Sequence, residues 1–220
     1  MGGVFVTGTG TEAGKTVVAA AIARGLAADG RRVAVFKPAV TGLEQDAEPD
    51  HELLRRAAAS EQSDDEIAPY RYGPAASPHL AAELAGETIE PARLVESARR
   101  AGDGADALVC EGVGGLLVPL TLGYLVRDLA RDLGLPLVVA APPGLGTINH
   151  TLLTLEAARG VGLSVAAVVL TPWPREPGEL ERSNREALRR LGGVEVETLA
   201  QLDRGDPGSW PRLAVQAAAA

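Results

Sequence analysis

Six short apolar runs recur along the chain, and segments of helical composition separate them. Most runs consist of valine, leucine and alanine without alternating polar residues. Such continuous apolar strands are typical of a parallel sheet that helices cover on both faces. The predicted strands are Val4–Thr7, Val33–Lys37, Ala107–Glu111, Leu137–Ala141, Val165–Thr171 and Val194–Thr198. The pattern therefore predicts an α/β fold with a parallel sheet flanked by helices on both faces.

Helical segments alternate with these strands. The first predicted helix runs from Lys15 to Asp29, where Asp29-Gly30 ends it. The other predicted helices are Asp50–Ser60, Pro91–Ala101, Tyr124–Leu133, Ile148–Gly160 and Glu179–Leu191. Long polar or proline-rich connections, interpreted as lids or as plain surface, are Gly42–Asp50, Pro69–Pro78 and Pro172–Gly178. Ligands of such sheets gather at the carboxyl ends of the strands, so the residues that follow each strand are the functional candidates.

A glycine-rich loop, Gly8–Thr16, joins the first strand to the first helix and is called the P-loop below. Its backbone N–H groups and the helix N-terminus favour a polyphosphate, whose outer phosphates Lys15 would neutralise. The Thr16 hydroxyl would coordinate the accompanying Mg²⁺. The loop is a variant, because Thr9 stands where the usual pattern has glycine. The alternative is a tight connection whose glycines only permit positive φ, but such a turn needs no Lys-Thr pair.

Two charged residues end the second and third predicted strands. Lys37 could direct its ammonium at a phosphate or a carboxylated intermediate, or it could be a solvated loop lysine. Glu111 precedes the glycine-rich segment Gly112–Gly115, which would let a substrate approach the backbone closely. A P-loop protein needs a carboxylate near its metal, so Glu111 is a candidate Mg²⁺ ligand, with a simple helix cap as the alternative.

The loop before the predicted helix Ile148–Gly160 offers a second anion site. Thr147 is the predicted N-cap, and free N–H groups at the helix start could bind an anion. A plain capped helix explains the same residues. His150 could act as a base, but a helix histidine is more often structural.

Composition narrows the class of protein. With 220 residues, 46% of them hydrophobic, the chain suits a single domain spanning residues 1–220. A net charge of -8 argues against a nucleic-acid partner. Cys110 lies in an apolar run and is predicted to be a buried strand residue. No apolar run approaches about 18 residues and no leader precedes the first strand, so we expect a cytoplasmic protein without a membrane partner.

Five motifs together resemble those of the dethiobiotin synthetase family, a group of P-loop carboxylate–amine ligases. They occur in the family's order over about the first two-thirds of the chain. The motifs are Thr7–Thr16, Lys37-Pro38 with Thr41-Gly42, Ser77-Pro78-His79, Glu111–Gly115 and Leu145–His150. The resemblance implies a single-domain P-loop NTPase-like homodimer that acts on 7,8-diaminononanoate, CO2, ATP and Mg²⁺. One amine captures CO2 as a carbamate, the γ-phosphoryl group transfers to it, and the second amine closes the cyclic urea.

The resemblance also implies roles for residues at matching positions. Lys37, Lys15 and Thr11 would be catalytic, and Thr16, Asp50 and Glu111 would hold the metal. Asp50 is chosen by its spacing from Lys37, although Asp46, Glu48 and Glu52 are its neighbours. The implied nucleotide-binding residues are Thr11, Glu12, Ala13, Gly14, Lys15, Thr16, Val17, Glu111, Thr171 and Pro172. The implied substrate-binding residues are Thr41, Gly146, Thr147, Ile148 and Asn149, of which the last four would receive the distant carboxylate of a diamine bound on the partner subunit.

One position departs from the family pattern. Where the family often carries an asparagine that contacts adenine, this chain has Thr171-Pro172. Proline has no N–H, and threonine lacks the paired donor and acceptor of an amide. The base would then rest against Pro172, Trp173 or the later segment Thr198–Pro207, and selectivity for adenine should be weak.

Two other classes share parts of this pattern. Partitioning-type ATPase switches usually have a signature lysine five places before the P-loop lysine, where this chain has Gly10. Their basic or amphipathic surfaces also differ from the acidic balance here. Amidating synthases of the cobyrinate type need a glutaminase domain with a nucleophilic cysteine, which Cys110 does not supply.

Overall fold

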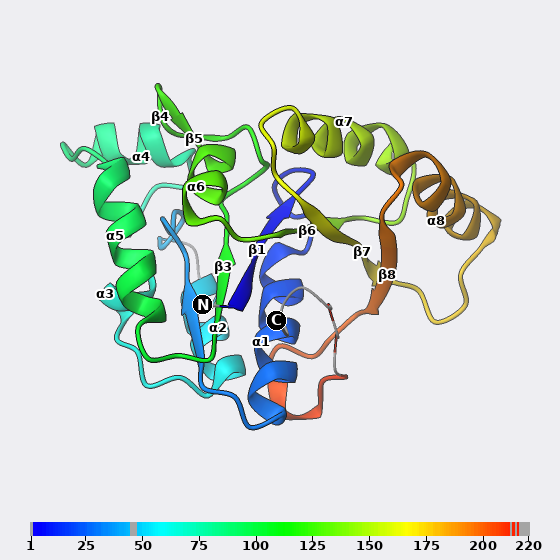
Figure 1. Ribbon diagram of the computed structural model, residues 1–220, viewed down its shortest axis with the longest axis horizontal. Helices are drawn as coiled ribbons and strands as arrows, with labels where there is room; N and C mark the ends of the chain where they lie inside the picture. The colour runs from blue at the N-terminus through cyan, green and yellow to red at the C-terminus, as the bar shows by residue number, and fades with distance from the viewer. Residues whose placement is uncertain (1, 45–47, 212, 214, 216–220) are drawn as a thin grey trace.

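Six parallel strands form one sheet in the computed structural model, which describes residues 2–44, 48–211, 213 and 215. The strand order is β2-β3-β1-β6-β7-β8. The strands are β1 (Gly2–Gly8), β2 (Val33–Phe36), β3 (Ala107–Glu111), β6 (Leu137–Ala141), β7 (Val165–Trp173) and β8 (Glu195–Ala200). This order places β1 and β3 side by side near the middle of the sheet (Figure 1).

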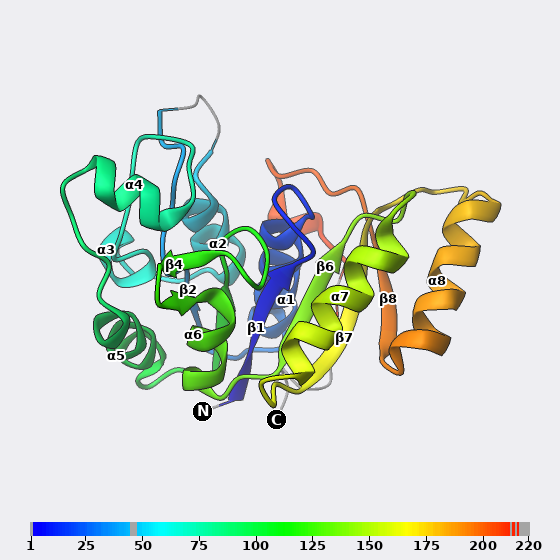
Figure 2. The ribbon, with the colours of Figure 1, turned by 90° about the horizontal axis from the view of Figure 1, so that it is seen from above.

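Helices cover both faces of the sheet, as predicted. On one face lie α1 (Lys15–Ala28) and α2 (Asp50–Ala58). On the other lie α5 (Pro91–Gly102), α6 (Val126–Leu133), α7 (Thr147–Arg159) and α8 (Glu179–Gly192). Figure 2 shows α1 and α2 on the opposite side of the strands from α6 and α7. The apolar runs are buried on both faces because both faces contact helices.

Alternation along the strands supplies the two cores, and strand register positions the charged residues. Val4 and Val6 pack toward α1, whereas Phe5 packs into the opposite core, and all three are fully buried. Val6 of β1 lies opposite Glu111 of β3, and Phe36 of β2 lies opposite Cys110. Lys37, which follows Phe36, therefore emerges beside Glu111. Cys110 is fully buried, which confirms the prediction for this residue.

Several predicted element bounds were wrong. The helix predicted over Tyr124–Leu133 begins at Val126, two residues later than predicted. Tyr124–Leu125 instead forms strand β5, which pairs with β4 (Pro119–Thr121). The Asp128 carboxylate accepts the Leu125 N–H at 2.8 Å and caps α6 there. Helix α2 ends at Ala58 because Ala59 adopts a left-handed φ of 49°.

Other short elements were missed. They are α3 (Asp64–Ile67), α4 (Pro78–Leu84) and the 3-10 turn Pro207–Ser209. The four-residue α3 is defined by a capping box between Ser63 and Glu66 rather than by apolar periodicity. Strand β7 extends two residues beyond the predicted Thr171. Asp46 and the alanine-rich tail Ala217–Ala220 lie outside the described residues. No helix within the described ranges is long and apolar enough to span a membrane.

Candidate active site

The P-loop connects the carboxyl end of β1 to the first turn of α1. Gly14 has φ +84° as the N-cap residue, a conformation that glycine adopts without strain. The Thr9 N–H donates to Ala140 O at 3.1 Å, which fixes the loop to β6. Because the amides of the first helical turn have no intrahelical acceptor, those of Lys15, Thr16 and Val17 are available to an anion.

Lys15 lies at the mouth of this loop. Its Nζ donates to Gly10 O at 2.9 Å, and the residue is only 8% exposed. Burial lowers the pKa of Lys15, and the nearby Glu111 carboxylate acts in the opposite direction. The ammonium is thus held over the loop, where phosphate groups would sit.

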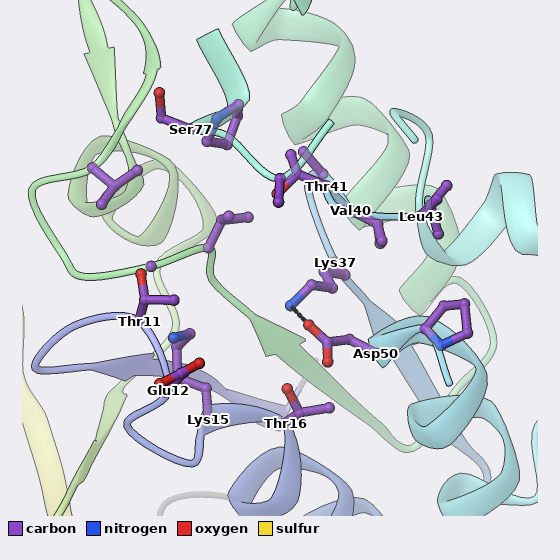
Figure 3. Close-up of a pocket in the computed structure, with 18 of the residues that line it drawn as sticks. Thr11, Glu12, Lys15, Thr16, Lys37, Val40, Thr41, Leu43, Asp50 and Ser77 are labelled. Carbon is purple, nitrogen blue, oxygen red and sulfur yellow. Dashed lines mark ion pairs between the residues drawn. The ribbon is translucent and has the colours of Figure 1, made fainter. Parts of the chain in front are cut away.

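A charged cluster lies beside the P-loop, built from the ends of β2 and β3 and the start of α2. Lys37 Nζ contacts Glu111 Oε1 at 2.7 Å and Asp50 Oδ2 at 2.8 Å. The Thr16 hydroxyl donates to Glu111 Oε1 at 2.8 Å and lies close to the Asp50 carboxylate, whose pKa it helps to lower. Figure 3 shows Lys37 and Asp50 pointing toward each other, with Thr16 beside Asp50. The structure thus brings together four residues that are far apart in the sequence.

The electrostatics of this cluster fix the charge of Lys37. Burial alone would lower the pKa of Lys37, but the carboxylates of Asp50 and Glu111 outweigh it and raise that pKa. Burial opposes ionisation of Asp50, yet Lys37 lowers the pKa of Asp50 to about 2. Lys37 is therefore a permanent cation at neutral pH.

Glu111 is completely buried, and burial raises the pKa of its carboxyl. Its second oxygen, Oε2, has no hydrogen-bond partner within the described part of the chain. A buried carboxylate oxygen without a partner is costly unless a cation or donor reaches it.

The donor set fits Mg²⁺, which prefers one or two carboxylates together with substrate phosphates and water. Thr16, Asp50 and Glu111 offer hard oxygen atoms beside the P-loop. Among the described residues, no group of three or more His, Cys, Asp or Glu side chains could hold a metal alone. A metal here would therefore share its ligands with a phosphate-bearing substrate.

A cleft of about 830 Å³ opens above these groups (Figure 3). Of the residues predicted from the sequence, those that line it are Thr11, Glu12, Gly14, Lys15, Thr16, Val17, Lys37, Thr41 and Asp50. Ser77 and Pro78, which belong to one of the family-like motifs, line the opposite wall. The cleft is thus polar at the P-loop and lined by small residues further out.

Other predicted residues lie outside this cleft. Ala13 is buried beneath the P-loop, and Glu111 lies at the buried base of the charged cluster. Thr171 packs behind the loop, where a Cβ on Gly14 would come within 2.4 Å of its Cγ2, while Pro172 is exposed.

The predicted carboxylate-binding residues begin α7 and do not line the cleft of their own subunit. The prediction of Thr147 as N-cap was wrong. Gly146 is the N-cap, with φ +91°, and Thr147 is the first helical residue and is buried. Gly146 and Asn149 are exposed to solvent.

Sequence reasoning missed one charged residue of the cleft, Arg204, and gave another, Glu48, a different role. Arg204 comes from the segment after β8, and its Nε lies 3.9 Å from Glu48 Oε2. Glu48, considered only as an alternative metal ligand, instead pairs with Arg56 at 2.6 Å. No motif could have revealed the contact of Arg204 with Glu48, since 156 residues separate the two in the chain.

Solved structures with the same fold are P-loop proteins. The chain matches chloroplast FtsY from Physcomitrella patens with a TM-score of 0.59 at 14% identity, covering 99% of this chain and 64% of that one. It matches a ParA family ATPase from Chlorobium tepidum with a TM-score of 0.56 at 13% identity, covering 93% and 87%. Identities this low show the fold alone. The fold and the loop geometry define a P-loop nucleotide-binding protein.

Sequence relatives narrow this class to one family. A family model described as an AAA domain matches residues 2–211. An ATP-dependent dethiobiotin synthetase of Anaeromyxobacter dehalogenans is 46% identical over 191 residues, covering 87% of this chain and 86% of the relative. Its counterpart in Bacillus subtilis is 36% identical over 197 residues, covering 89% and 85%. The chain belongs to the family of ATP-dependent dethiobiotin synthetases, which confirms the resemblance drawn from its motifs.

Proposed function

We propose that this chain synthesises dethiobiotin from 7,8-diaminononanoate, CO2 and ATP, as a ligase of biotin biosynthesis in the cytoplasm. The observation that carries the proposal is the buried cluster beside the P-loop, in which Lys37 contacts both Asp50 and Glu111. This cluster combines one fixed cation with two carboxylates at the base of a cleft that Lys15 also lines. A reaction that joins two anionic groups, a carbamate and a triphosphate, needs such an arrangement.

The chemistry begins when one amine of the substrate adds to CO2 and loses a proton, which leaves a carbamate. Lys37 and Thr11 would position the carbamate oxygen against the γ-phosphorus. Attack breaks the bond to the ADP oxygen and forms a carbamic–phosphoric anhydride. The second amine then adds to the carbamate carbon, expels phosphate and closes the urea ring. Phosphoryl transfer of this kind depends on positioning and charge stabilisation more than on a catalytic acid–base triad.

Each charged residue has a part in this sequence. Lys15 and the P-loop amides would neutralise the β- and γ-phosphate oxygens, and Lys37 would stabilise charge on the transferring group. Thr16, Asp50 and Glu111 would hold Mg²⁺, which would offset the negative charge of the triphosphate. The unpartnered Glu111 Oε2 supports that assignment. Thr41 lines the outer cleft, where the diamine would lie.

We infer that the active form is a homodimer in which α7 of the partner subunit receives the substrate carboxylate. The start of α7 offers free N–H groups but lies outside the cleft of its own subunit. Six of the large exposed leucines lie on α4, in the segment before β4, in the β4–β5 turn, on α7 and in the loop before it, along the top of Figure 1. They are Leu80, Leu84, Leu117, Leu122, Leu145 and Leu153. Exposed apolar side chains on one side of a molecule favour a protein interface.

A partitioning-type ATPase switch is the alternative. The ParA-like fold is compatible with it, but Gly10 occupies the position of the signature lysine. Phosphate release separates the two functions. We expect release from ATP to depend on both 7,8-diaminononanoate and bicarbonate and to match dethiobiotin formed, as counted by mass spectrometry. Release that is indifferent to both compounds would favour the switch.

A further inference from the structure

One buried amide side chain holds the loop that leads into α7. Asn184 lies on α8, which packs beside α7 (Figures 1 and 2), and is 6% exposed. Its Nδ2 donates to Pro143 O at 2.8 Å and to Gly144 O at 3.1 Å. An asparagine amide has two N–H donors, and here they match two consecutive backbone carbonyls. Neither sequence motifs nor the cleft draw attention to this residue.

These two contacts determine which way the loop amides point. In a trans peptide unit the N–H lies opposite to the C=O. Because the carbonyls of Pro143 and Gly144 are directed at α8, the N–H groups of Gly144 and Leu145 are directed away from it. The Thr147 N–H turns back to Gly144 O at 3.3 Å, and Gly146 completes the bend with φ +91°. Asn184 thereby holds the two peptide units that lead into the bend, and the bend at Gly146 sets where the first amides of α7 lie.

We propose that Asn184 is a positioning residue for substrate recognition, because it fixes the β6–α7 loop in the conformation that presents the Gly146–Asn149 amides to the substrate carboxylate. This inference rests on the proposed function. The loop would otherwise be mobile, since Leu145 at its centre is 93% exposed and makes little contact with the protein. Without the Asn184 amide, Pro143 O would lose its donor and Gly144 O would keep only the Thr147 N–H, so both peptide units would be free to rotate.

The test replaces Asn184 with leucine, which has similar volume but no donor. We expect the KM for 7,8-diaminononanoate to rise about tenfold, while kcat and the KM for ATP stay within about twofold of the parent. With the neutral 7,8-diaminononanamide, parent and variant should give the same kcat/KM, because the amides then have no charge to bind. A purely structural role would affect both substrates equally.

A matched control comes from the neighbouring residue of α8. Arg185 Nε donates to Val196 O at 3.3 Å, so Arg185→Met removes a side-chain hydrogen bond of the same helix that is directed at β8. This variant should keep the parent KM for the diamine. If Asn184→Leu does not fold, Asn184→Ser retains one donor and should give a smaller rise in the same KM.

Failure of the inference and failure of the function have different signatures. A parent that prefers the carboxylate over the carboxamide, together with an Asn184→Leu protein of unchanged KM, overturns the role of Asn184 only. Equal losses with both substrates overturn it as well. A parent that forms no dethiobiotin from the carboxylate contradicts the proposed function itself.

Discussion

At the scale of single residues, the site depends on charged side chains that are buried and that water therefore cannot solvate. Lys37 and Glu111 are 3% and 0% exposed, and their side chains form an ion pair. Removing one partner of such a pair leaves an uncompensated buried charge, which is strongly destabilising. Lys15 differs, because it donates to a backbone carbonyl and projects into the cleft. Its substitution should therefore report on catalysis rather than on folding.

We predict that Lys15→Ala lowers kcat by about a hundredfold or more, since loss of one transition-state donor costs on the order of 3 kcal/mol. The thermal unfolding midpoint should change little. Steady-state kinetics and a thermal melt of the same preparation measure both quantities. Retention of more than about a tenth of the parent kcat would refute the role of Lys15 in phosphoryl transfer.

At the scale of elements, the strands were predictable and the short elements were not. The strands β1, β2, β3 and β6 form from apolar runs that any parallel sheet would bury, and the ends of β2 and β3 place Lys37 and Glu111 together. The β4–β5 hairpin has strands of three and two residues, too short for a periodic pattern. Contacts such as those of Asn184 and Arg204 join distant segments by polar atoms alone, so no local pattern encodes them.

Two carboxylates near the start of α2, Asp50 and Glu48, are candidate metal ligands. Asp50 contacts Lys37 and Thr16, whereas the Glu48 carboxylate forms an ion pair with Arg56. We predict that Asp50→Asn shifts the Mg²⁺ dependence of the rate to higher concentration by about tenfold or more, because one carboxylate ligand loses its charge. Glu48→Gln, the matched control, should leave the Mg²⁺ curve in place. If Glu48→Gln shifts the Mg²⁺ curve and Asp50→Asn does not, Glu48 is the metal ligand instead of Asp50.

The end of β7 determines the expected nucleotide selectivity. Thr171 is buried behind Gly14 and Pro172 has no N–H, so neither offers an amide pair to the base. We predict that kcat/KM for ATP, CTP, GTP and ITP differs by no more than about a hundredfold, at roughly 1–3 kcal/mol for a lost pair of hydrogen bonds. Measurement uses saturating diamine. An ATP preference above about a thousandfold would mean that main-chain groups of Thr198–Pro207 recognise adenine.

At the scale of the whole molecule, the proposed homodimer needs two chains for each active site. The P-loop cleft and the start of α7 belong to the same subunit but to separate surfaces, which the sequence order alone could not reveal. Motif content nevertheless predicted both surfaces, because each consists of a loop at the carboxyl end of a strand.

Mixing two inactive variants tests this sharing. Lys15→Ala disables the P-loop, and Asn149→Glu places a negative charge at the proposed carboxylate subsite. If sites are shared, exchange of subunits gives heterodimers with one intact site, and about a quarter of parent activity should return at equal amounts. Activity that stays at the sum of the separate variants would mean that each site is built within one subunit.

In the proposed reaction, a carbamate oxygen attacks the γ-phosphorus of ATP. Incubation of the protein with ¹⁸O-labelled CO2, 7,8-diaminononanoate, ATP and Mg²⁺, followed by mass spectrometry of both products, tests it most directly. The oxygen that forms the new bond to phosphorus leaves with the phosphate when the ring closes. We predict one labelled oxygen in each phosphate and one in each dethiobiotin. Unlabelled phosphate, released at the same rate without the diamine, would contradict it.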